Sequence, residues 1–111
     1  NLYKNILNIK VGDIVNLDTL KEKLVLLGYE RYDLIEGKGQ FSIRGGIVDI
    51  AISEKQGVRI ELWGDEIDSI QSVELIVVAD IFGKESGTEI MVYRKIFAEV
   101  DFRRGCIVGK E

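Results

Sequence analysis

The sequence predicts an α+β fold in which one main helix packs on a small, mainly antiparallel β-sheet. Three observations support this class. Only residues 17–27 carry leucines at a clear helical spacing. Several later segments alternate apolar and polar residues with the period of two that is typical of strands. The connections between those segments are too short to hold the crossover helices that parallel strands require. The length of 111 residues fits a single domain over residues 1–111.

The first elements along the chain are a strand and the helix. Residues 7–11 alternate apolar and polar side chains, which predicts a half-buried strand. The helix is predicted from Asp18 to Leu27, with Asn16 or Asp18 capping its first turn and Gly28 ending it. Its apolar stripe consists of Leu17, Leu20, Leu24 and Leu27. Because one helix cannot bury such a stripe alone, we expect it to lie on the sheet.

The sheet is predicted from the segments that follow. Alternation indicates strands over residues 40–44, 47–52, 59–63 and 66–72. Gly45-Gly46 suggests a sharp bend or bulge, and Gly64-Asp65 a two-residue hairpin turn. Two further β-rich segments, 73–79 and 89–100, are expected to form another hairpin through the glycines of 83–87.

Strand alternation also predicts which side chains face solvent. If Ile60 and Leu62 point into the core, Arg59 and Trp63 must point the other way, and Arg44 is expected on the same outward side. Tryptophan and arginine are the residues most enriched at binding hot spots, so this side is a candidate docking surface. Two simpler interpretations stay open. A half-exposed tryptophan often covers a neighbouring strand, and arginines on a sheet are often solvated or paired with local carboxylates.

Composition argues against most enzyme designs. The chain has no histidine, so it cannot build a histidine-based triad or metal site, and its single cysteine, Cys106, cannot form an internal disulfide. Gly37-Lys38-Gly39 lacks the rest of a phosphate-binding loop pattern. We therefore predict no catalytic residue, no cofactor and no metal. The net charge of −4 disfavours nonspecific nucleic-acid binding by the whole domain. Without a long apolar run or a signal-peptide layout, we expect no membrane contact and a cytoplasmic location.

Three blocks of sequence resemble a known family. They are Leu-Gly-Tyr-Glu-Arg at 27–31, Gly-Gln-Phe-Ser-Ile-Arg-Gly-Gly-Ile-Val-Asp-Ile at 39–50, and Val-Arg-Ile-Glu-Leu-Trp-Gly-Asp-Glu-Ile-Asp-Ser-Ile at 58–70. Together they resemble the UvrB-homology, UvrA-binding domain that the bacterial transcription-repair coupling factor (Mfd) shares with UvrB. The resemblance covers about residues 8–70 and leaves 71–111 as a divergent, β-rich tail.

This resemblance implies a non-catalytic module that docks onto UvrA in transcription-coupled nucleotide excision repair. It implies a parent protein that is a larger ATP-dependent DNA translocase and that contacts RNA polymerase and DNA. The family's docking positions fall on Arg44, Arg59 and Trp63, and a further docking arginine of UvrB corresponds more weakly to Arg31.

Two alternatives to UvrA docking come from other functional classes. The first is a nucleic-acid-binding piece that uses the exposed aromatic residue together with the basic tail residues Arg94, Lys95, Arg103 and Arg104. The second is a structural remnant that forms a homodimer by pairing its tail strands across a two-fold axis.

Overall fold

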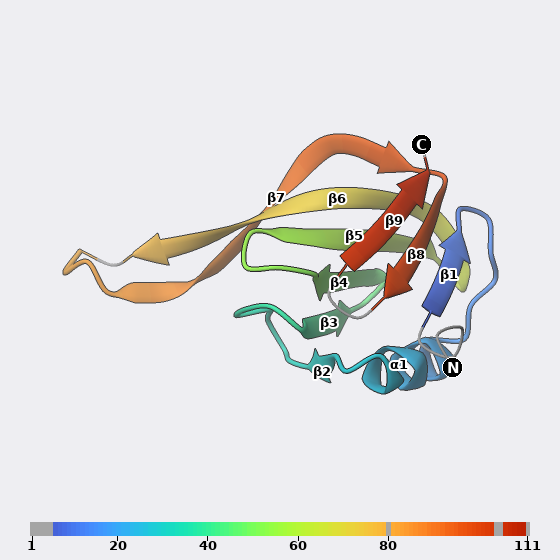
Figure 1. Cartoon of the computed structure of the whole chain (residues 1–111), viewed down its shortest axis with the longest axis horizontal. Helices are drawn as coiled ribbons and strands as arrows, with labels where there is room; N and C mark the ends of the chain where they lie inside the picture. The colour runs from blue at the N-terminus through green and yellow to red at the C-terminus, as the bar shows by residue number, and fades with distance from the viewer. Residues whose placement is uncertain (1–5, 80, 104–105, 111) are drawn as a thin grey trace.

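The structure, a computed structural model, describes residues 6–79, 81–103 and 106–110. Within them lie nine strands in two sheets and one ten-residue helix (Figure 1). In chain order the elements are β1 (Ile6–Lys10), α1 (Leu17–Leu26), β2 (Glu30–Arg31), β3 (Gln40–Arg44), β4 (Ile47–Ala51), β5 (Gln56–Trp63), β6 (Glu66–Ala79), β7 (Glu85–Phe97), β8 (Glu99–Arg103) and β9 (Cys106–Lys110).

The predicted α+β class is wrong, because the fold is mainly β. One sheet of six strands has the order β2-β3-β4-β5-β6-β7, and a second sheet of three strands has the order β1-β8-β9. All pairings are antiparallel except the short parallel contact between β2 and β3. The second sheet, which pairs the first strand with strands of the tail, shares with the helix the covering of the core.

The main core lies between the two sheets and the helix. Leu7 and Ile9 of β1 and Val100 and Phe102 of β8 are buried, and they join one cluster with the apolar side chains of α1 and of the large sheet. Phe41 of β3 is fully buried in the same cluster. The helix was predicted to cover the inner face of the sheet by itself, but it shares this face with β1 and β8.

The helix itself forms where it is predicted. The Asn16 side-chain oxygen accepts hydrogen bonds from the backbone N–H groups of Asp18 (2.9 Å) and Thr19 (3.1 Å), which satisfies donors that the first turn leaves unpaired. Leu20 and Leu24 are buried in the main core, and the chain turns away after the helix at Gly28. This helix and its cap are confirmed, with boundaries one residue earlier than expected.

The hairpin predicted for the tail is present and longer than expected. β6 runs without interruption from residue 66 to residue 79, because no turn-forming residue separates the two segments that the sequence analysis treated as distinct. β6 and β7 extend together beyond the rest of the large sheet as a two-stranded arm (Figure 1). Ile81 and Phe82 are exposed at its tip.

The turn between β3 and β4 is built on glycine for two separate reasons. Gly45 has a φ of +58°, a conformation that L-residues with a side chain adopt at a cost. Gly46 lies against β5: its carbonyl accepts a hydrogen bond from the Leu62 N–H (2.7 Å), and a Cβ at this position would stand 2.7 Å from the Leu62 carbonyl oxygen. The turn therefore touches the strand that carries Trp63.

We expect Gly46→Ala to lower the free energy of unfolding by about 1–3 kcal/mol, because backbone must shift to make room for the methyl group. Gly37→Ala is the matched control, since its Cβ would meet only a flexible side-chain atom, Glu54 Oε2, at 3.9 Å. The control should leave stability unchanged or slightly higher. Urea unfolding followed by circular dichroism measures both variants, and equal midpoints would contradict the close approach of Gly46 to β5.

Candidate functional site

The orientation of β5 defines the candidate site. Val58, Ile60 and Leu62 are buried in the main core, whereas Trp63 is 81% exposed. The inward orientation of Ile60 and Leu62 predicted from alternation is therefore confirmed. We call the face of the large sheet that points away from the main core the outer face.

Strand register brings the predicted docking residues of β3 and β5 onto this outer face. Residues that oppose each other in an antiparallel pair project to the same side of the sheet. Arg44 opposes Ile47, which opposes Glu61, and Asp49 opposes Arg59 one row further along. Glu61, Arg59 and Trp63 alternate with the buried residues of β5, so Arg44, Arg59 and Trp63 share the outer face.

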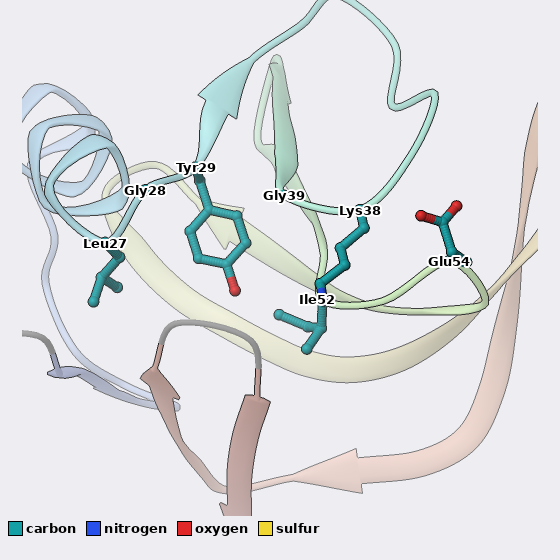
Figure 2. Close-up of a pocket in the computed structure, with 7 residues that line it drawn as sticks. All are labelled: Leu27, Gly28, Tyr29, Lys38, Gly39, Ile52 and Glu54. Atoms are coloured by element: carbon teal, nitrogen blue, oxygen red, sulfur yellow. The ribbon is translucent and has the colours of Figure 1, made fainter.

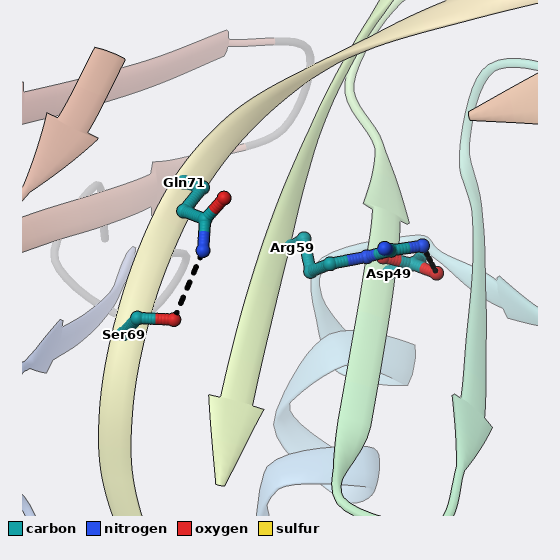
Figure 3. A network of polar contacts seen from close by, with 4 residues as sticks. All are labelled: Asp49, Arg59, Ser69 and Gln71. Carbon is teal, nitrogen blue, oxygen red and sulfur yellow. Dashed lines mark hydrogen bonds and ion pairs between the residues drawn. The ribbon is translucent and has the colours of Figure 1, made fainter. Parts of the chain in front are cut away.

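Arg59 is held by an internal partner that the sequence analysis did not identify. Its Nε donates to Asp49 Oδ1 (2.8 Å) and its Nη2 donates to Asp49 Oδ2 (3.2 Å), as Figure 3 shows for the side chain reaching from β5 across to β4. The Asp49 side chain is only 3% exposed and that of Arg59 is 20% exposed. The hydrogen-bonded Asp49 carboxylate raises the pKa of Arg59, against the opposing effect of partial burial. The Arg59 guanidinium is therefore positively charged and held in one position by Asp49.

The outer face is less open than alternation alone predicts. Ser42 and Asp49 point away from the core but are buried. At the end nearer the arm, Ile35 from the loop after β2 packs on the outer-face residues Ala51, Val73 and Leu75 in a second apolar cluster. The open part of the outer face is therefore the opposite end, where the β3–β4 turn and the β5–β6 turn lie.

Arg44 and Ile47 stand at this open end. Both are exposed, and the Arg44 side chain makes no hydrogen bond or ion pair with any other described residue. Ile47 lies beside Arg44 in the same cross-strand row. Ile47 was not among the predicted docking residues, although the alternation over residues 47–52, with Val48 and Ile50 pointing inward, was the signal that could have placed it there.

Arg31 is not brought together with the other three residues. It lies on β2 at the edge of the sheet and opposes Phe41, whose side chain belongs to the main core. Residue 31 therefore occupies a register position on the core side of the sheet, away from the outer face, although its side chain is exposed at the edge.

A pocket of about 440 Å³ lies away from the outer face. It is lined by Leu27, Gly28, Tyr29, Lys38, Gly39, Ile52 and Glu54, and Figure 2 shows Tyr29 and Ile52 extending toward the same space. Its two charged residues, Lys38 and Glu54, are solvent-exposed. A specific small-molecule site needs polar groups that converge on a shielded ligand, so we assign no ligand to this pocket.

Other kinds of site find little support in the described part of the chain. No group of three or more histidine, cysteine, aspartate or glutamate side chains there could hold a metal ion, and no helix there is long and apolar enough to cross a membrane. Of the basic tail residues, Arg104 lies outside the described residues, as do the side chains of Arg94 and Arg103. The side chain of Cys106 is also outside the described part. Lys95 is exposed, and its Nζ lies 5.3 Å from the centre of the Phe97 ring.

Comparison with known proteins gives one family. The model of the UvrB interaction domain matches residues 7–92. The transcription-repair-coupling factor of Bacillus subtilis (strain 168) is 49% identical over 65 residues, which cover 58% of this chain and 6% of that protein. Those of Staphylococcus haemolyticus (strain JCSC1435) and Staphylococcus aureus (strain USA300) are 41% and 39% identical over 69 residues, 62% of this chain and 6% of each relative. The family match covers most of the chain, which therefore belongs to the UvrB interaction domain family.

Proposed function

We propose that this chain is a docking module that binds UvrA through Arg44, Arg59 and Trp63 on the open end of the outer face. The observation that carries the proposal is the exposed Trp63 on the same face as two arginines. A tryptophan left 81% exposed is an expensive surface residue unless a partner covers it. The family description as an interaction domain supports a role in binding rather than in catalysis.

Trp63 supplies the apolar anchor in this proposal. It follows directly after the buried Leu62, and its neighbours at the two adjoining turns, Gly45 and Gly64, have no side chains that would cover the indole ring. A partner can therefore enclose the ring and remove it from water. Anchors of this type carry about 2 kcal/mol or more of binding free energy at protein interfaces.

Arg44 and Arg59 have different tasks. Arg44 has its whole guanidinium fork available, so it can pair with a carboxylate of the partner through two parallel hydrogen bonds. Arg59 already gives two of its five N–H donors to Asp49 and keeps the others for a contact at fixed geometry. We therefore expect an acidic patch on UvrA, and an attraction that weakens as salt is added.

The wider setting is part of the same proposal. This chain spans 6% of the length of the relatives that it matches, which carry the name transcription-repair-coupling factor. We place it in a larger ATP-dependent DNA translocase of transcription-coupled nucleotide excision repair, in the cytoplasm, with the contacts to RNA polymerase and DNA made by the parent protein. Nucleic-acid binding by the tail and homodimer formation stay predictions, which gel shifts at low salt and sedimentation at high concentration would test.

Trp63→Ala should weaken binding to purified UvrA by about thirtyfold or more, the equivalent of an anchor's contribution. Phe82→Ala is the matched control, because Phe82 at the tip of the arm is also aromatic and also 81% exposed. Isothermal titration calorimetry with the 111-residue chain gives both dissociation constants. Equal losses in the two variants would show that exposed aromatic area, and not the outer face, determines the affinity.

Arg44→Ala should weaken UvrA binding by about tenfold at low salt and by less at high salt, because a charged contact is screened. Arg31→Ala removes the same charge from the other side of the sheet and should change the affinity by less than about threefold. The measurement is a salt series of dissociation constants for both variants. An Arg31 effect as large as that of Arg44 would move the docking surface to the β2 edge.

Asp49→Ala and Arg59→Ala should each lower the free energy of unfolding, by about 2–3 kcal/mol for Asp49→Ala, which leaves a partly buried guanidinium without its partner. The double variant should lose less than the sum of the two single losses, because the two residues act as one pair. Arg44→Ala, an exposed control, should stay within about 0.5 kcal/mol of the unmodified chain. Additive losses in urea unfolding would show that the pair contributes nothing as a unit.

A further inference from the structure

The segment 12–15, between β1 and α1, extends the large sheet at its open end. Gly12 N donates to Ile67 O (2.8 Å), Ile67 N donates to Asp13 O (2.9 Å), and Val15 N donates to Asp65 O (2.8 Å). β7 pairs with β6 only from Ile70 onward, so the start of β6 has an edge that β7 leaves unoccupied. The segment 12–15 takes this edge through the antiparallel bridge between residues 14 and 66.

This bridge puts Ile14 in one row with Trp63. Glu66 opposes Trp63 in the β5–β6 hairpin and opposes Ile14 in the bridge, so the three side chains project to the same side of the sheet. Burial agrees, because Val15 packs against the main core while Ile14 is 67% exposed. With strands about 4.8 Å apart, Trp63 and Ile14 flank Glu66 at a separation of about 10 Å.

We propose that Ile14 is a second apolar anchor of the docking surface. This inference rests on the proposed function and extends its surface across a further segment of the chain. The occupant is the same partner protein, because Ile14 continues the row that contains the exposed Trp63. The chemistry of the row defines the complementary patch: two apolar contacts about 10 Å apart, with a basic or hydrogen-bond-donating group between them that faces the exposed Glu66.

Rigidity distinguishes Ile14 from other exposed apolar residues. Single exposed aliphatic side chains are common and need no explanation by themselves. Leu26 on α1, for example, is 78% exposed but stands on the last residue of a helix, outside the row. The backbone on both sides of Ile14 is fixed by two hydrogen bonds to Ile67 of β6 and one to Asp65 of the β5–β6 turn, so covering its side chain requires little additional ordering of the chain.

The test compares Ile14→Ser with Leu26→Ser in calorimetric titrations of the 111-residue chain with purified UvrA. We expect Ile14→Ser to weaken binding about tenfold, as the loss of a buried aliphatic contact does, and Leu26→Ser to change it less than about twofold. Ile14→Leu, which keeps an aliphatic side chain, should stay within about threefold of the unmodified chain. All three variants should keep the unfolding midpoint of that chain, because residues 14 and 26 are exposed.

The outcomes separate this inference from the proposed function. If Trp63→Ala and Arg44→Ala weaken binding while Ile14→Ser stays within twofold, the docking surface stands and the second anchor is wrong. If neither Trp63→Ala nor Arg44→Ala alters the affinity, or if UvrA does not bind the unmodified chain, the proposed function fails and the anchor with it. A loss in Leu26→Ser equal to that in Ile14→Ser also overturns the assignment.

Discussion

The outer face depends on the way in which β5 is fixed in the sheet. Val58, Ile60 and Leu62 are buried, and burying each such side chain contributes about 1.5–3 kcal/mol. Because side chains alternate along a strand, a slip by one residue would expose all three and turn Arg59 and Trp63 into the core. The energy that buries the inner residues is therefore the same energy that presents the tryptophan and the arginine to solvent.

The two faces of the large sheet are covered to different extents, because most of the segments outside this sheet pack on its inner face. The inner face receives the helix and the whole second sheet, which together close the main core. The outer face receives one loop, which brings Ile35 onto its arm-side half. No described segment packs over Trp63 at the other end, where the segment 12–15 joins the edge of the sheet without covering its face. Trp63 is therefore exposed because the segments that cover the large sheet lie on its inner face and on the arm-side half of its outer face.

The features that the sequence predicted are those set by neighbouring residues. The capped helix, the Gly64-Asp65 turn and the buried pattern of Ile60 and Leu62 follow from local spacing, and all are present. The fold class failed because β1 pairs with β8, about ninety residues away, and alternation does not reveal which strands will meet. Ile14 was missed for the same reason, since its position depends on a bridge to Glu66. The pairing of Asp49 with Arg59 was easier to predict, because the short β4–β5 hairpin fixes the register that places these two residues opposite each other.

The pairing of Arg59 with Asp49 determines what each arginine would contribute to the proposed complex. The chain carries a net charge of −4, so its average field repels carboxylates, and in the proposed complex the attraction has to come from direct contacts of individual arginines. Arg59 and Asp49 together are neutral, and Glu61 and Glu66 add negative charge to the same face, so Arg44 would attract a carboxylate of the partner through direct contact. The contribution of Arg59 would differ, because its guanidinium is already ordered and partly desolvated, so a new hydrogen bond to it costs less entropy than one to a mobile side chain. In the proposed complex, Arg44 would therefore supply the charged contact and Arg59 would fix the alignment of the partner.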